Sequence, residues 1–293
     1  MSLLYEYRKS LKMVEVEEFF DLFFYRPLAF ILVKIIYPTN ITPNQLTVTA
    51  ILFGIAAGCV YAVGSPLSLV AGSLFFLCYN IIDCSDGQLA RLKKNGTYAG
   101  RIIDGLGDYI TAVAVFVGLG IGHPDHNFSP TTWYLLMLAI AISNMVQSIL
   151  VDYYRNRFLD YVLERKSTFE EDMDAFKNEY QAIKDQKNKR LDRWIIGAYF
   201  KYSALQDKLI PKKKGEKLFK ADPQEYYKKN KIQIRLLVTI GPTAQVTVLM
   251  ICAALCRFDI YFWLILVVFN SIAAILWLVQ NKIDKSFTTN VQQ

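Results

Sequence analysis

The sequence predicts an all-α integral membrane protein with six transmembrane helices. The first observation is composition: 53% of the residues are hydrophobic and the mean hydropathy is +0.23, although 20% of the residues are charged. The second is a series of apolar runs long enough to cross a hydrocarbon core of about 30 Å as helices. The third is the concentration of Lys and Arg in alternate connections between these runs, which is typical of membrane topology.

The first part of the chain, residues 1–44, is expected not to span the membrane. Residues 11–36 mix apolar and charged side chains, and the uninterrupted apolar run from Leu28 to Val33 is too short to cross. We therefore expect a cytoplasmic N-terminus followed by an amphipathic helix that lies in the membrane interface. Thr42 is a suitable N-cap and Pro43 suits the first helical position, so the first spanning helix is expected to begin there.

Residues 45–293 are expected to form a second unit, the six-helix domain. Gly241 and Pro242 predict a kink in its fifth span. A polar segment, residues 155–232, separates helices four and five, and we expect it to be a helical cytoplasmic insert whose basic surface rests on anionic lipid. The predicted spans are residues 45–63, 67–91, 99–121, 131–153, 235–256 and 260–280.

The distribution of positive charge predicts the orientation of the chain. The net charge of +7 concentrates in the N-terminal residues, the Lys93-Lys94 turn, the 155–232 insert and the segment containing Lys282 and Lys285. By the positive-inside rule these parts are cytoplasmic, which places both termini and the turn after helix two on that side. Charge arranged in this way indicates topology and does not suggest a nucleic-acid partner.

Four carboxylates interrupt the second and third apolar runs. Asp83 and Asp86 are three residues apart and Asp104 and Asp108 are four apart, so each pair lies on one helix face. If residues 92–99 turn the chain, the two helices are antiparallel and the four carboxylates converge. Each carboxylate in hydrocarbon costs at least a few kcal/mol, so the group requires a compensating cation. Hard oxygen ligands favour Mg²⁺ or Mn²⁺ over zinc.

The stretch from Asp83 to Asp108 resembles the signature of the CDP-alcohol phosphotransferase (CDP-alcohol phosphatidyltransferase) family at every fixed position. The Thr42-Pro43-Asn44 entry to the first span also resembles that family. The matching positions are Asp83, Asp86, Gly87, Ala90, Arg91, Gly100, Asp104 and Asp108.

The resemblance implies a role for each of these residues. Asp83, Asp86 and Asp104 would be metal ligands for two Mg²⁺ or Mn²⁺ ions, and Asp108 would be a further ligand or the catalytic general base. It also implies a homodimer. The CDP moiety of the donor would be bound by Asp86, Gly87, Ala90, Arg91 and Gly100.

The implied reaction belongs to phospholipid biosynthesis. A phosphatidyl group would pass from CDP-diacylglycerol, a CDP-linked lipid donor, to a polar alcohol, with release of CMP. Inositol phosphate is the favoured acceptor, because basic residues flank the insert and family members that use this acceptor hold its phosphate with basic residues in this region. These candidate acceptor-binding residues are Arg155, Arg157, Lys231 and Arg235.

Three alternatives remain at the level of sequence. The same chemistry would serve the reverse pairing, in which a CDP-aminoalcohol gives its headgroup to diacylglycerol. An intramembrane prenyltransferase also uses two Asp-rich helices, although its pairs usually have three intervening residues, unlike Asp83 and Asp86. A divalent-cation transporter would use the carboxylates as its ion site, but no polar cluster continues a path to the opposite side.

Overall fold

The computed structural model describes residues 3–10, 13–122, 127–164 and 222–289, together with 178, 181, 196 and 197. All regular secondary structure in this part of the chain is helical, and six of its helices are long and apolar enough to cross a membrane. The predicted all-α membrane fold is therefore confirmed. Most of the predicted 155–232 insert lies outside the described residues.

Three helices form the first half of the bundle: α3 (Pro43–Tyr61), α4 (Pro66–Lys93) and α5 (Tyr98–Gly122). As predicted, Thr42 caps α3, and it forms a capping box with Gln45 and is followed by Pro43 in the first turn. α3 packs closely against both α4 and α5, whereas these two make few direct contacts with each other. α3 is therefore the support that holds the two signature helices side by side.

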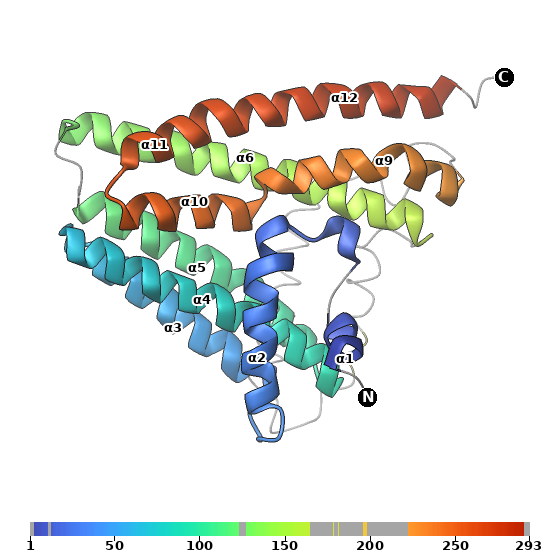
Figure 1. The fold of residues 1–293 in the computed structure, drawn as a ribbon, viewed down its shortest axis with the longest axis horizontal. Helices are drawn as coiled ribbons and strands as arrows, with labels where there is room; N and C mark the ends of the chain where they lie inside the picture. Colours follow the sequence, from blue (N-terminus) through green and yellow to red (C-terminus); the bar gives the residue numbers. More distant parts are fainter. Residues whose placement is uncertain are drawn as a thin grey trace.

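The second half of the bundle contains the remaining three spans. Its fifth span is broken where predicted: Gly241 is extended, with φ −70° and ψ 176°, and Pro242 begins a new helix. α10 packs against α4 and so joins the halves (Figure 1). The elements are α6 (Pro130–Val162), α9 (Pro223–Leu237), η4 (Val238–Ile240), α10 (Pro242–Ala254), α11 (Phe258–Trp263), η5 (Leu264–Phe269) and α12 (Asn270–Thr289).

A chain of buried amides holds the second half together. Gln245 Nε2 on α10 donates to Gln147 Oε1 on α6 at 3.1 Å, and Gln147 Nε2 donates to Asn270 Oδ1 on α12 at 2.7 Å. Asn270 Nδ2 in turn donates to Ser143 Oγ at 2.9 Å. Lipid supplies no hydrophobic drive for helix association, so such interhelical hydrogen bonds and close packing determine which helices associate.

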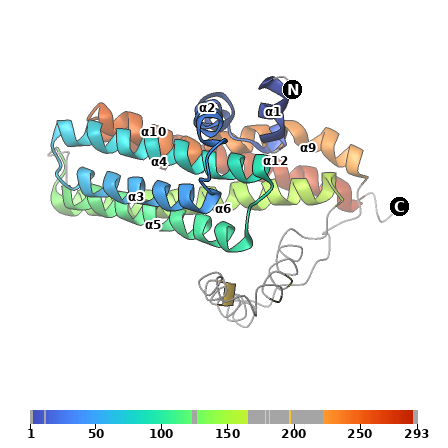
Figure 2. The same ribbon diagram turned by 90° about the horizontal axis from the view of Figure 1, so that it is seen from below.

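The N-terminal segment differs from the single amphipathic helix predicted over residues 11–36. It contains a π-helical turn, η2 (Asp21–Tyr25), that continues into α2 (Arg26–Ile36), and a short 3₁₀ turn, η1 (Val14–Val16), precedes them. A further helix that was not predicted, α1 (Leu3–Ser10), precedes η1. α2 runs across the long axis of the bundle, and α1 and α2 lie together on one side of it (Figures 1 and 2).

Two hydrogen bonds fasten α2 to α4. Ser85 Oγ donates to the carbonyl of Ala29 at 3.3 Å, and Gln88 Nε2 donates to the carbonyl of Arg26 at 3.0 Å. Ser85 and Gln88 are both fully buried. α4 therefore presents one face to α2 and keeps the face with Asp83 free for α5.

The N-terminal segment also caps the broken fifth span. The Glu18 carboxylate accepts hydrogen bonds from the backbone N–H groups of Thr243 at 2.9 Å and Ala244 at 3.3 Å. Gly241, the N-cap residue of α10, has no side chain to do this. A Cβ atom on Gly241 would lie 2.4 Å from Glu18 Oε1, so glycine is what admits the carboxylate. Glu18 thus supplies from another segment the cap that α10 lacks.

Gly241→Ala is expected to lower the free energy of unfolding by about 1–3 kcal/mol, because the added methyl group displaces the Glu18 carboxylate. Thermal or denaturant unfolding in detergent measures this. Gly105→Ala is the matched control, since a Cβ there meets no heavy atom within 4 Å. The control is expected to retain or slightly exceed the stability of the unmodified protein. Equal effects of the two substitutions would contradict the capping role.

Stability is expected to depend on pH through Glu18. Burial raises the pKa of Glu18 to about 8, and neighbouring Asp21 acts in the same direction, while Arg155 and the two capped N–H groups oppose them. The folded protein therefore binds this proton more tightly than the unfolded chain, and stability falls as pH rises from about 4.5 to about 8.

Glu18→Gln keeps an acceptor for the capped N–H groups but has no proton to lose. Its unfolding midpoint, measured from pH 5 to pH 9, is expected to fall less over this window than that of the unmodified protein. Parallel curves for the two proteins would show that Glu18 is not the group responsible.

Candidate active site

Three of the four predicted carboxylates converge between α4 and α5. Asp83, Asp86 and Asp104 each offer one oxygen atom, and these atoms all lie within 4.8 Å of one another. Ligands on opposite sides of an octahedral Mg²⁺ ion are about 4.2 Å apart, twice the usual Mg–O distance, so this spacing suits a single hard cation. The three residues therefore fit the metal that the sequence predicted.

Asp86 is held from the supporting helix. Its Oδ2 accepts a hydrogen bond from Thr47 Oγ1 on α3 at 2.5 Å, and only 7% of Asp86 is exposed. The Thr47 hydroxyl also lies 3.2 Å from the carbonyl of Pro43, one turn earlier in α3. Because Thr47 is buried and bonded to its own helix, it fixes the position of the Asp86 carboxylate relative to α3.

Asp108 lies outside the three-carboxylate group. Its Oδ1 accepts a hydrogen bond of 2.5 Å from the hydroxyl of Tyr79 on α4. Asp108 is exposed, whereas Tyr79 is only 6% exposed. A buried hydroxyl therefore holds one oxygen of this exposed carboxylate.

Three of the four carboxylates have no ion-pair partner in the described part of the chain. Within the described ranges, no Lys or Arg forms an ion pair with Asp83, Asp86 or Asp108. Several acidic groups this close repel one another, and burial among apolar helices strengthens the repulsion. A bound divalent cation would offset the negative charge of the carboxylates and so reduce this repulsion.

The small residues of the signature have different surroundings. A Cβ atom on Gly100 would lie 2.4 Å from Asn44 Oδ1, so packing alone requires glycine there. At Gly87, the nearest atoms to an added Cβ belong to the Arg91 guanidinium, at 3.5 Å, which is ordinary contact. Packing therefore does not demand glycine at position 87, where the Arg91 guanidinium is the neighbouring group. A Cβ on Gly96 would lie 3.3 Å from Ala90 Cβ, which places Ala90 beside the turn between α4 and α5.

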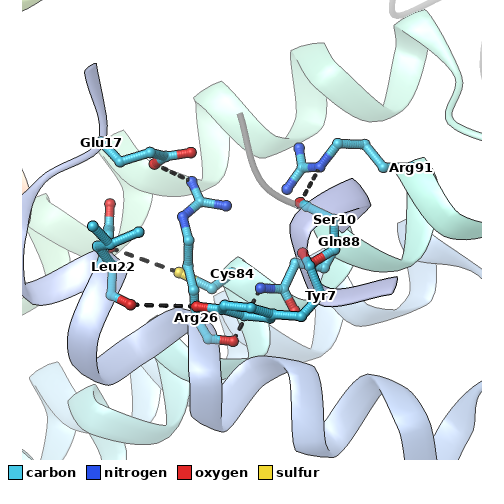
Figure 3. A network of polar contacts seen from close by, with 9 residues as sticks. Tyr7, Ser10, Glu17, Leu22, Arg26, Cys84, Gln88 and Arg91 are labelled. Atoms are coloured by element: carbon cyan, nitrogen blue, oxygen red, sulfur yellow. Dashed lines mark hydrogen bonds and ion pairs between the residues drawn. The ribbon is translucent and has the colours of Figure 1, made fainter. Parts of the chain in front are cut away.

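Arg91 is engaged by the N-terminal helix. Its Nε donates to the carbonyl of Ser10 at the end of α1, at 2.6 Å (Figure 3). Tyr7 on the same helix donates from its hydroxyl to the carbonyl of Leu22 at 3.3 Å. Arg91 thus lies at the junction of α1 and α4, with its guanidinium beside Gly87.

The neighbouring face of α4 meets the rest of the N-terminal segment. The Cys84 thiol contacts Asp21 Oδ1 at 3.9 Å, and buried Arg26 forms an ion pair with Glu17 at 2.7 Å (Figure 3). Cys84, the residue after Asp83, therefore lies on a different face of α4. The N-terminal segment therefore covers the side of α4 opposite to the metal-binding group.

The four candidate acceptor-binding residues lie on α6 and α9 and have different surroundings. Arg157 is buried and forms an ion pair with Asp284 on α12 at 2.7 Å. Lys231 and Arg235 are exposed on α9, and Lys231 lies over the ring of Tyr227. Arg157 is therefore held by an ion pair with α12, and Lys231 by a contact with an aromatic ring of its own helix.

Arg155 is the member of this set with a link to the carboxylates. It pairs with Asp152 on its own helix, and Asp152 lies close enough to Asp108 for an electrostatic interaction. Arg155 also interacts with Glu18 and Asp21 of the N-terminal segment. Among the four candidates, Arg155 is the one whose printed contacts lead toward Asp108.

Sequence reasoning did not identify Thr47 and Tyr79. Tyr79 precedes Asp83 by four residues, which places both on one face of α4, so its position carried a signal. Thr47 follows the Thr42-Pro43-Asn44 entry and lies on α3, and nothing in its own spacing indicates a contact with Asp86. That contact depends on how α3 packs against α4.

Comparison with known proteins agrees with the geometry. Residues 40–163 match the family model described as CDP-alcohol phosphatidyltransferase. Over 122 residues the chain is 31% identical to the "Bifunctional IPC transferase and DIPP synthase" of Thermococcus kodakarensis (strain ATCC BAA-918 / JCM 12380 / KOD1). That match covers 41% of this chain and 25% of the Thermococcus protein. The part of the chain that matches this family model, residues 40–163, carries all four aspartates of the signature.

Proposed function

We propose that this protein transfers a phosphatidyl group from CDP-diacylglycerol to a polar alcohol and releases CMP. The observation that carries the proposal is the convergence of Asp83, Asp86 and Asp104 within 4.8 Å, inside a segment that matches the transferase family. Asp83, Asp86 and Asp104 would hold Mg²⁺ or Mn²⁺, with two ions expected when the donor is bound. Such ions would offset the negative charge of the diphosphate during phosphoryl transfer.

Asp108 would act as the general base. The acceptor hydroxyl gives its proton to the free oxygen of Asp108 as its own oxygen bonds to the phosphorus of the phosphatidyl group. The bond from that phosphorus to the bridging oxygen breaks, and CMP leaves with the bonding electrons. The exposure of Asp108 and its place outside the three-carboxylate group support this assignment.

The donor nucleotide would lie beside Gly87. Asp86, Ala90 and Arg91 belong to the same stretch of α4. Arg91 can meet a phosphate of the donor if it exchanges the Ser10 carbonyl for a phosphate oxygen, since guanidinium groups bind both. Gly100 would allow the Asn44 side chain to approach α5 closely.

Inositol phosphate is the proposed acceptor. The support is the similarity to the Thermococcus relative, an inositol-phosphate transferase, which is 31% identical to this chain over 122 residues. Arg155 is the proposed contact for the acceptor phosphate, because it connects through Asp152 to the neighbourhood of Asp108. An anionic acceptor would compete with Asp152 for Arg155. Arg157, Lys231 and Arg235 would act only if the cytoplasmic ends of α6 and α9 rearrange.

The proposed orientation places both termini and the site on the cytoplasmic side of the membrane. The support is the clustering of Lys and Arg at the N-terminus, at Lys93 and Lys94, and near Lys282 and Lys285. A homodimer is proposed from the family resemblance alone.

Asp83→Asn is expected to reduce CMP release about 1,000-fold or more, because several kcal/mol of metal-dependent charge stabilisation is lost. Release is measured from purified protein in lipid with Mg²⁺, CDP-diacylglycerol and inositol phosphate. Chelation of the metal is expected to stop release, and added Mg²⁺ to restore it. Asp259→Asn is the control, since Asp259 is an exposed residue paired with Arg257. Full activity in Asp83→Asn would contradict the proposed metal site.

An acceptor panel is expected to identify the substrate and test Arg155. CMP release should require inositol phosphate, and Arg155→Gln should raise the KM for it about 10-fold or more with a smaller change for the donor. Release only when CDP-choline or CDP-ethanolamine meets diacylglycerol would reverse the donor assignment. A third outcome is that no donor and acceptor pair releases CMP, while Mn²⁺ still binds and proteoliposomes show ion flux. This outcome would favour a divalent-cation transporter.

A further inference from the structure

We propose that Tyr79 is a positioning residue for Asp108: its hydroxyl holds one carboxylate oxygen and thereby aims the other at the acceptor hydroxyl. This inference rests on the proposed function, because it concerns the group assigned as the general base. The 2.5 Å hydrogen bond from the Tyr79 hydroxyl to Asp108 Oδ1 is the contact that carries it.

The Tyr79 ring is itself fixed in place. It is 6% exposed and stacks on Phe76, with ring centroids 5.6 Å apart and an interplanar angle of 22°. Phe76 is 3% exposed and belongs to the apolar core of the bundle. A packed aromatic side chain has only two rotatable bonds, so the position of its hydroxyl is set by the core. Tyr79 therefore transfers the rigidity of α4 to a carboxylate on α5.

The Asp108 side chain needs such a partner. The final torsion of an aspartate is broad and roughly two-fold, so an exposed carboxylate without a fixed contact turns readily. The tyrosine hydroxyl has a single proton, and it donates this proton to Oδ1. The Oδ2 atom is left to accept a proton from a ligand. Misplacement of a reacting group by about 1 Å can cost about 100-fold in rate, so loss of this orientation is expected to slow the reaction.

Two hydroxyl groups in the site hold different carboxylates. Thr47 holds Asp86, which belongs to the three-carboxylate group, whereas Tyr79 holds Asp108, which stands outside it. Loss of the Thr47 hydroxyl is therefore expected to act on metal binding. Loss of the Tyr79 hydroxyl is expected to act on the chemical step. This difference separates a positioning role for the base from a general disturbance of the site.

Tyr79→Phe tests the inference, because it removes the hydroxyl and keeps the ring. We expect kcat for CMP release to fall about 10- to 100-fold, as for other residues that orient a catalytic group. The KM values for donor and acceptor should change less than about twofold, because the variant keeps the binding groups. Mn²⁺ affinity, measured by electron paramagnetic resonance without substrates, should also change less than about twofold.

Tyr61→Phe is the matched control. Tyr61 is fully buried in the same bundle, and its hydroxyl is 2.9 Å from Ser73 Oγ, so the substitution removes one hydroxyl and one hydrogen bond away from the carboxylates. Its kcat should stay within about twofold of the unmodified protein. Thr47→Val provides the opposite pattern, with weaker Mn²⁺ binding, because it releases Asp86.

The outcomes distinguish this inference from the proposed function. If the unmodified protein releases no CMP, the proposed function fails first. If it is active and Tyr79→Phe matches Tyr61→Phe, the positioning role is overturned while the function stands. Weaker Mn²⁺ binding in Tyr79→Phe would also overturn it, because Asp108 would then be a metal ligand that Tyr79 supports.

Discussion

The repulsion among four carboxylates inside an apolar helix bundle is the constraint on which the rest of the structure depends. Asp83, Asp86 and Asp104 have oxygens within 4.8 Å of one another, and no Lys or Arg in the described part of the chain forms an ion pair with Asp83, Asp86 or Asp108. A bound cation would offset this repulsion, and the positions of the carboxylates must then be held while ligands exchange. The bundle meets this requirement with α3, which packs on both signature helices and supplies Thr47.

The N-terminal segment connects the two halves of the helix bundle. Glu18 caps α10 in the second half, while Ala29 and Arg26 accept hydrogen bonds from α4 in the first. α1 continues the same segment to Arg91 near the C-terminal end of α4. The N-terminal partners in these contacts, such as Ser10 and Ala29, precede residues 40–163, so a segment outside the region that matches the family model supports α4.

Much of this fold follows from the sequence because its causes are local. Apolar length fixes the six spans, Thr42 and Pro43 fix the start of α3, and Gly241 and Pro242 fix the break in the fifth span. The convergence of Asp83, Asp86 and Asp104 also follows, since helical spacing and one turn determine it. The contacts of Thr47, Tyr79 and Glu18 do not follow, because each joins segments whose relative placement depends on tertiary packing. α1 was missed because its eight residues are mostly polar and its position depends on Arg91.

The buried amide chain of the second half has a consequence for the order in which the protein is made. Gln147 pairs with Asn270, which is 123 residues further along, so at 5–20 residues per second it enters the bilayer roughly 6–25 s before that partner is synthesised. During this interval α6 carries amide groups that lipid cannot satisfy. The insertion machinery or the first three helices must shelter that face of α6 until α10 and α12 arrive, so correct assembly depends on timing as well as on final contacts.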